Sequence, residues 1–288
     1  PERFRLAGYE TFGTGKWHNG PESFGRSFAI GRSIHFGGMD DHTRVGIQDL
    51  LPDGRYSPRK PSPRFSSEQF ANEIIEYLKR PADSPPFFAY VAFTAPHDPR
   101  NPPQEWRDRY YARRPPLPRN YLPQHPFDNG DLVLRDENLL PWPRPPELLR
   151  DQLAEYYGLV GHLDEQVGRI LDALGQSSFA TNTLVVYAAD HGLALGSHGL
   201  LGKQNLYEHS MRCPLIIAGP GIPAGRSTQA LTYLYDLYPT LCGLTALDPP
   251  AELDGLDLAP LWTGAREQVR DSLFLAYQGL MRSVRDSR

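Results

Sequence analysis

Three short apolar runs, each ending in polar or glycine-rich residues, constrain the fold of this chain more than any other feature. They occupy residues 87–93 (FFAYVAF), 183–189 (TLVVYAA) and 214–219 (PLIIAG). Their apolar residues stand at successive positions, which is typical of strands covered on both faces. Helical patterns over 66–78 and 147–175 precede the first two runs. This alternation predicts an α/β fold with a largely parallel sheet and helices on both faces.

Local signals predict where the helices begin and end. Ser66 and Gln69 have the spacing of a capping box, and Gly175 is suited to end the long helix. A short helix is expected around Tyr207 and a further helix over 236–244.

The segment 99–146 has no sustained periodicity and contains twelve prolines. Its first half, 99–126, carries six arginines against two acidic residues. Long irregular segments inside a domain are usually either functional or disordered. Two interpretations therefore stay open, a solvated, mobile surface loop, or a lid or wall that attracts an anionic substrate.

Composition argues against several classes of function. The net charge of −4 provides no basic field for nucleic acid or an acidic membrane. No apolar run approaches the length of a membrane span, and the first residues do not form a signal peptide. Cys213 and Cys242 are too few for a disulfide framework, and their apolar neighbours favour small buried side chains.

Polar side chains cluster beside the predicted strands and glycine-rich turns. In α/β sheets, binding and catalytic groups lie at the carboxyl ends of strands and in the loops that follow. Each cluster alone has an ordinary structural explanation, such as a turn-forming aspartate or a solvated lysine, but four together favour a site. They are Lys16 with His18 on the glycine-rich turn of GYETFGTGKWH, His97 with Asp98, Asp190 with His191, and His198 with Lys203.

These residue types suit one kind of chemistry. Lys16 and Lys203 are compact cations for an anion with several oxygens, such as sulfate or phosphate. Histidines transfer protons near neutral pH and can protonate a leaving group. The adjacent Asp190 and His191 can supply two metal ligands. The set predicts metal-assisted hydrolysis of an oxyanion ester, and it leaves sulfate and phosphate undistinguished.

Several blocks of the sequence resemble the type I sulfatases, members of the alkaline phosphatase superfamily. GYETFGTGKWH resembles the second signature of that family, with Thr14 where a small apolar residue or serine is usual. AFTAPHDP, VVYAADHGLALGSHGLLGKQNLYEHSMRCPLIIAGPG and YDLYPTL then follow in the family's order. The resemblance implies an alkaline-phosphatase-like fold and one sulfatase catalytic domain over 1–288, partial, with the Pro/Arg-rich segment 99–146 inside it.

The resemblance also implies roles for individual side chains. The family's nucleophile is a formylglycine used as its hydrate. The lysine matching Lys16 stabilises the ionised form of that group, and the histidine matching His18 contacts its other hydroxyl and helps release sulfate. His97 matches a histidine that contacts the sulfate ester and assists leaving-group departure, and Lys203 matches a lysine that binds a sulfate oxygen.

A divalent cation, usually Ca²⁺, is the expected cofactor. Asp190 and His191 match two of its ligands in the family. Calcium prefers oxygen ligands, so Asp190 is the stronger candidate of the two. We expect His198 either to have a structural role or to contact the residues that bind the substrate without touching the substrate itself.

The family's first signature, C-x-P-S-R or its serine form, is absent from this sequence, as is the expected pair of aspartates on a first strand. Cys213 is followed directly by Pro214, so it does not begin that motif. We expect a fragment that lacks the N-terminal strand and part of a C-terminal subdomain and that hydrolyses no sulfate ester alone. The full-length protein would need a formylglycine-generating or maturase enzyme, and relatives are usually exported or lysosomal.

The stretch NGPESFGRSFAIGRSIHFGGMDDH resembles sulfatases of sulfated carbohydrates. If this resemblance extends to the substrate, His42 or the arginines after Pro99 would contact sugar, sulfate or uronate. The alternative interpretation is that Asp40, Asp41 and His42 only form a polar turn. Two other functions stay open. One is a phosphodiesterase or phosphonate monoester hydrolase of the same superfamily, and the other is a non-catalytic protein that binds oxyanions.

Overall fold

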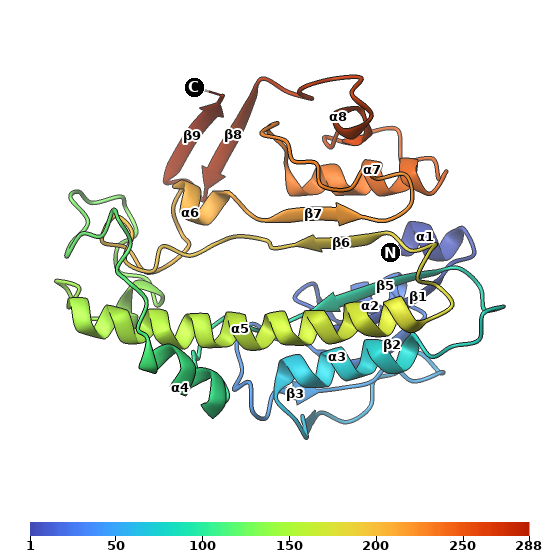
Figure 1. Ribbon diagram of the computed structural model, residues 1–288, viewed down its shortest axis with the longest axis horizontal. Coiled ribbons are helices and arrows are strands. Elements are labelled where there is room, and N and C mark those ends of the chain that lie inside the picture. The colour runs from blue at the N-terminus through green and yellow to red at the C-terminus, as the bar shows by residue number, and fades with distance from the viewer. Residues whose placement is uncertain (288) are drawn as a thin grey trace. The chain divides into compact units, whose positions relative to one another are not determined.

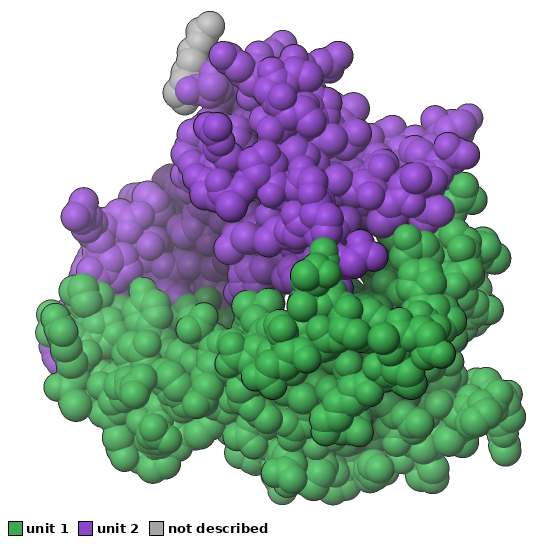
Figure 2. Space-filling model, turned by 45° about the vertical axis from the view of Figure 1, so that its right-hand side comes forward, with its two compact units in different colours: residues 1–116, 150–181 green, residues 117–149, 182–288 purple. Residues whose placement is uncertain are grey.

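The computed structural model describes residues 1–287 and divides the chain into two compact units. Unit 1 comprises Pro1–Pro116 and Arg150–Thr181, and unit 2 comprises the segments 117–149 and 182–288 (Figure 2). Both units draw on two separate stretches of the chain, so each is assembled by contacts between residues distant in sequence.

Unit 1 is built on a three-stranded parallel sheet (Figure 1). Strand β1 (Glu10–Lys16) lies in the centre, between β2 (Ile30–His35) and β5 (Phe87–Ala92). This sheet confirms the predicted parallel arrangement for the run at 87–93, whereas the runs at 183–189 and 214–219 form an antiparallel pair. The expectation that GYETFGTGKWH forms a glycine-rich turn is wrong, because most of it is the central strand.

Two glycines make the centre of this sheet possible. A Cβ on Gly15, where φ is +91°, would lie 1.9 Å from the carbonyl oxygen of Ala92 on the neighbouring strand. A Cβ on Gly13 would lie 2.8 Å from the ring of Phe24. The glycines therefore serve close approach of the strand to its neighbours, not a reversal of the chain.

Side chains of β5 divide between two apolar clusters, one on each side of the sheet. Phe87, Ala89 and Val91 pack in a cluster with Phe12, while Phe88 packs with the cluster around Phe24. The continuous apolar run thus predicted two covered faces correctly. Its burial is less complete than predicted, since Tyr90 is 40% exposed.

Helices supply most of the cover in unit 1. Helix α3 (Ser66–Tyr77) and the later turns of α5 (Pro146–Gln176) pack on the Phe12 side, and α2 (Gly20–Ser27) contributes Phe24 to the other (Figure 1). The remaining elements of this unit are α1 (Glu2–Leu6), β3 (Gly46–Ile47), β4 (Lys60–Pro61) and α4 (Gln104–Ala112).

Two predicted helix ends differ from the structure. Ser66 is the first helical residue of α3, the N-cap is Phe65, and no side chain caps the helix, so the predicted capping box is wrong. The Ser66 hydroxyl instead bonds to buried side chains outside the helix. Gly175 does not end α5, because the helix continues through Gln176.

Unit 2 contains two antiparallel strand pairs, β6 (Val185–Ala188) with β7 (Leu215–Ala218) and β8 (Ser272–Tyr277) with β9 (Met281–Asp286). The two strands predicted in this region are confirmed, but Tyr187 and Ile216 are 42% and 61% exposed. An apolar run predicts a strand more reliably than it predicts what covers each face. The helices are η1 (Glu137–Leu139), α6 (Glu208–Met211), η2 (Leu234–Asp236), α7 (Leu237–Leu244) and α8 (Ala259–Thr263).

The proline-rich segment is more ordered than a solvated loop. It contains α4 and η1, and four of its polar side chains are at most 4% exposed: His125, Asp136, Glu137 and Arg144. Residues 125–144 of the segment therefore do not form a solvated loop.

Both cysteines are free thiols, and Cys242 is buried in α7. None of the helices within residues 1–287 combines the length and apolar character that crossing a membrane requires.

Replacing Gly15 by alanine should strongly destabilise the protein, because the new Cβ would overlap the Ala92 carbonyl. Gly20 is the matched control, since it has φ +81° but nothing within 4 Å of a built Cβ. We expect Gly20→Ala to cost about 1 kcal/mol from backbone strain alone. Gly15→Ala should cost at least about 3 kcal/mol. Urea unfolding of both variants measures the difference, and equal losses would contradict the close-approach explanation.

Candidate active site

Three of the predicted site residues lie at the carboxyl end of the parallel sheet in unit 1. Lys16 is the last residue of β1 and pairs with His35 at the end of β2. His18 follows two residues later and is exposed. His97 lies in the loop after β5. The structure therefore brings Lys16, His18 and His97 to one edge of the sheet, where α/β proteins hold their functional groups.

Trp17 anchors the chain between Lys16 and His18. Its ring makes edge-on contacts with Phe24, Phe28 and Tyr90, and its indole N–H donates to Ser23 Oγ over 2.8 Å. The backbone N–H of Trp17 also donates to the His35 carbonyl over 2.9 Å. A packed aromatic side chain thus fixes the backbone on which the two polar side chains stand.

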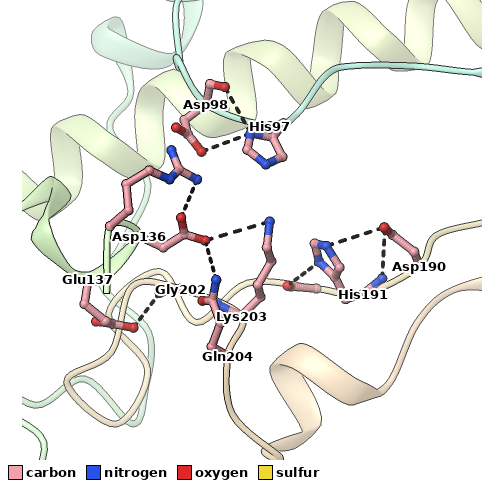
Figure 3. Close-up of polar contacts among 11 residues, drawn as sticks. His97, Asp98, Asp136, Glu137, Asp190, His191, Gly202, Lys203 and Gln204 are labelled. Carbon is pink, nitrogen blue, oxygen red and sulfur yellow. Dashed lines mark hydrogen bonds and ion pairs between the residues drawn. The ribbon is translucent and has the colours of Figure 1, made fainter. Parts of the chain in front are cut away.

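The ring of His97 is held by its neighbour Asp98 (Figure 3). Nδ1 of His97 lies 3.0 Å from the carbonyl oxygen and 3.0 Å from Oδ1 of Asp98, and both side chains are less than 20% exposed. An imidazole oriented by a carboxylate through Nδ1 is the arrangement used for proton transfer at Nε2. Sequence analysis noted Asp98 as a neighbour of His97 but gave it no role.

Asp190 and His191 follow β6 in unit 2 (Figure 3). Oδ2 of Asp190 lies 3.5 Å from Nε2 of His191, and the aspartate side chain is 81% exposed. Nδ1 of His191 lies 3.1 Å from the carbonyl oxygen of Gly192. Gly192 is itself fixed, because its N–H donates to the Ser210 carbonyl over 2.9 Å.

This pair fits a divalent cation in donor type. A histidine that binds a metal through one ring nitrogen commonly donates its other N–H to a backbone carbonyl, as Nδ1 of His191 can to Gly192. The Asp190 carboxylate supplies the hard oxygen ligand that calcium prefers. Within residues 1–287, no group of three or more His, Cys, Asp and Glu side chains is placed to hold a metal.

Lys203 is held by an acidic residue that sequence analysis missed. Its Nζ lies 3.8 Å from Oδ2 of Asp136, which is 4% exposed (Figure 3). Asp136 also accepts a hydrogen bond from Gln204 Nε2 over 3.1 Å and forms an ion pair with Arg135. A nearly buried carboxylate thus sets the position of the lysine in unit 2.

A buried ion pair fixes the loop that carries Lys203. The Arg144 side chain is fully buried, and its Nη2 lies 2.5 Å from Glu137 Oε2. The two oxygens of Glu137 accept the backbone N–H groups of Leu201 and Gly202 over 2.9 and 2.8 Å. Arg144 Nε donates to the Gly199 carbonyl over 3.2 Å. Residues 199–202 are therefore tied to the proline-rich segment immediately before Lys203.

His198 lies in an aromatic cluster that favours the expected structural role. Its ring stacks on Tyr207 at 4.3 Å, and its carbonyl accepts a hydrogen bond from His125 Nδ1 over 2.7 Å. His209 completes the cluster, 5.6 Å from Tyr207. Burial lowers the pKa of His209 to about 4, with a smaller contribution from the charge on His198.

The expectation that His42 contacts a sugar is wrong, because this side chain is only 1% exposed. Its neighbours do form a polar turn. Asp41 Oδ1 accepts the N–H and hydroxyl of Thr43, which lowers the pKa of Asp41. Asp40 Oδ2 accepts the N–H of Gly46 over 3.0 Å.

Removing the charge of Glu137 should be costly, because Arg144 would remain buried without its counter-ion. We expect Glu137→Gln to lower the free energy of unfolding by about 3 kcal/mol or more. Glu208→Gln is the control, since Glu208 and its partner Arg285 are 56% and 37% exposed. An exposed pair of this kind contributes about 0–1 kcal/mol. Chemical unfolding of both variants tests this, and a small effect of Glu137→Gln would show that the buried pair is dispensable.

The stability of the protein should fall in acid partly through His209. Its folded pKa of about 4 lies below the ordinary value of 6.5, so between these values the unfolded chain binds a proton that the folded chain does not. The free energy of unfolding should therefore decrease as pH falls from about 6.5 toward about 4. His209→Phe should remove roughly 1–2 kcal/mol of this dependence. Urea titrations at several pH values measure it, and an unchanged slope in the variant would count against this assignment.

Comparison with known proteins agrees with the fold and with the motifs. A family model described as Sulfatase matches residues 1–247. The chain is 31% identical to N-acetylgalactosamine-6-sulfatase of Canis lupus familiaris over 307 residues, covering 97% of this chain and 51% of the relative. The solved structure of BT4656 in complex with its substrate D-glucosamine-2-N,6-O-disulfate is similar with a TM-score of 0.79 and 20% identity, covering 99% of this chain and 70% of that one.

A phosphonate monoester hydrolase of Agrobacterium radiobacter is also similar in structure, with a TM-score of 0.71 and 24% identity over 94% of this chain and 63% of that one. These likenesses confirm the predicted alkaline-phosphatase-like α/β fold. The chain spans about half the length of the curated relatives it matches. Because the family model covers most of the chain, the protein belongs to the sulfatase family, the type I sulfatases of the alkaline phosphatase superfamily.

Proposed function

We propose that this chain is part of an enzyme that hydrolyses sulfate esters, with sulfated carbohydrates as its substrate class. The observation that carries the proposal is the placement of Lys16, His18 and the oriented His97–Asp98 pair at one edge of the sheet. Cations and proton donors at the carboxyl ends of neighbouring strands suit an oxyanion ester whose leaving group needs a proton.

Each residue has a distinct part in the proposed reaction. Lys16, at the end of β1, stabilises the ionised form of the nucleophile. His97, oriented through Nδ1 by Asp98, delivers a proton to the leaving oxygen from Nε2. His18 assists release of sulfate, and Lys203, held by Asp136, binds a sulfate oxygen.

Two components complete the proposal. Asp190 and His191 would hold a divalent cation, which we propose is Ca²⁺ and which would neutralise charge on the sulfate oxygens. The nucleophile would be a formylglycine contributed by residues other than 1–288, made by a formylglycine-generating or maturase enzyme. On this proposal the 288-residue chain alone hydrolyses no sulfate ester, and the complete protein is exported or lysosomal.

The carbohydrate class is supported by the similar proteins. The dog relative is named for a sulfate on N-acetylgalactosamine, and BT4656 is described with a disulfated glucosamine as its substrate. The similarity to the phosphonate monoester hydrolase concerns the fold alone, so it does not favour phosphonate over sulfate. A non-catalytic protein that binds oxyanions would need the lysines, but it would not need a histidine oriented for proton transfer as His97 is.

The test uses the complete protein and measures turnover of 6-sulfated N-acetylhexosamine against an aryl phosphonate monoester. We expect sulfate to be preferred, and we expect Lys203→Ala and His97→Ala each to lower kcat/KM by about 10²-fold or more. Lys79→Ala is the control, because this lysine pairs with Glu76 at an exposed position and should leave the rate unchanged. Faster cleavage of the phosphonate would favour the alternative hydrolase, and sulfate binding without turnover would favour the non-catalytic protein.

A further inference from the structure

His42 is almost fully buried near the proposed site, and both nitrogens of its ring are engaged. Nε2 lies 2.8 Å from the carbonyl oxygen of His97. Nδ1 lies 3.1 Å from Ser66 Oγ and 3.1 Å from Thr94 Oγ1. The ring is 1% exposed and stacks on Phe65 with centroids 5.5 Å apart. It therefore cannot meet a substrate, yet it bonds to the backbone of a residue that does in the proposed reaction.

The partners of His42 fix where its proton lies. A backbone carbonyl can only accept, so Nε2 must carry a hydrogen and donate it to His97. In the neutral ring Nδ1 is then the acceptor, and Ser66 or Thr94 donates to it. Thr94 in turn donates to Ser66 Oγ over 2.8 Å. The hydrogen bonds thus run in one direction, from Thr94 through Ser66 and His42 to His97.

This chain of hydrogen bonds joins three separate parts of unit 1. Ser66 begins α3, Thr94 follows β5, and both side chains are at most 4% exposed. A second contact supports the same connection, because Asn101 Nδ2 donates to Asp41 Oδ1 over 3.2 Å. The turn around His42 therefore holds the loop after β5 at two places.

Few side chains could replace His42 in this position. The ring must accept at one atom and donate at another on its opposite side, and it must keep both atoms at a fixed separation. Burial lowers the pKa of His42, which is consistent with a neutral ring that accepts at Nδ1. Aspartate, asparagine and serine are too short to span from Ser66 to the His97 carbonyl.

We propose that His42 is a positioning residue that fixes the backbone of His97, and through it the imidazole that protonates the leaving group. The inference rests on the proposed function for its kinetic meaning. The hydrogen bond from His42 to His97 is the structural part, and it is measurable without any turnover.

The kinetic test compares His42→Gln with His42→Asn in the complete protein. Glutamine places an amide N–H near the position of Nε2, whereas asparagine reaches only the position of Nδ1. We expect His42→Asn to lower kcat by about 10- to 100-fold with KM changed less than about threefold, because a displaced catalytic group loses rate more than binding. His42→Gln should recover most of that loss. Equal kcat values in wild type and His42→Asn would overturn the proposal.

His162→Gln separates positioning from stability. His162 is 2% exposed in the same unit, and its ring contacts Glu68, Gln166 and Phe65. Among residues 1–287 it forms no hydrogen bond, ion pair or ring contact with the loop after β5. We expect this variant to unfold at lower urea concentration with an unchanged kcat. If His162→Gln lowers kcat as much as His42→Asn does, loss of stability explains both and the positioning role is wrong.

The structural test uses histidine labelled with ¹⁵N in the complete protein. NMR should show the Nε2–H tautomer for His42 at pH 7, and hydrogen exchange at residues 97–101 should speed up in His42→Asn but not in His162→Gln. An Nδ1–H tautomer would overturn the proposal whatever the kinetics. If the complete protein turns over no sulfate ester, the proposed function fails, while the tautomer still decides whether His42 holds the His97 backbone.

Discussion

The buried pair of Glu137 and Arg144 is the interaction on which the backbone leading to Lys203 depends, because it joins residues 137–144 to residues 199–202. This part of unit 2 has few regular elements, so ladder hydrogen bonds cannot organise it. The guanidinium instead donates to the carbonyls of Glu137, Leu140 and Gly199, and the carboxylate accepts two backbone N–H groups. A buried charge pair seldom adds net stability, but it tolerates only one arrangement of its partners. Here that arrangement fixes the backbone before Lys203.

Unit 1 uses the same strategy with neutral groups. Trp17 fixes the backbone between Lys16 and His18, and His42 bonds to the backbone of His97. In both cases a well-packed ring holds main-chain atoms, and a side chain with a proposed role in the reaction projects from that backbone. Functional groups held in this manner need less reorganisation when charge develops during a reaction.

The sequence allowed the location of the site to be predicted better than its supports. A polar residue after an apolar run indicated His97 as a candidate, because strand ends follow from local patterns, whereas Lys16 was chosen from a segment predicted to be a glycine-rich turn. Asp136, Glu137 and Arg144 could not be found in this way, since their partners are up to 68 residues distant and the segment has no periodicity. The capping box at Ser66 failed for a related reason, because a buried hydroxyl found tertiary partners instead of the helix end. The glycines of β1 were misassigned to a turn because close strand packing leaves the same signature.

The contact between Lys203 and Asp136 has a consequence for how an anion would arrive. At 3.8 Å the ammonium is already partly neutralised, so in the proposed reaction a sulfate oxygen would exchange with a carboxylate that is already present and would not simply add to an open charge. Asp136 would not be left without a partner by this exchange, because it retains its ion pair with Arg135 and its hydrogen bond from Gln204. Lys203 would therefore select among anions by competition with Asp136. A weakly charged or strongly hydrated solute would gain too little binding energy to displace the carboxylate. A group that gathers negative charge as its bond breaks would gain the most binding energy in the transition state.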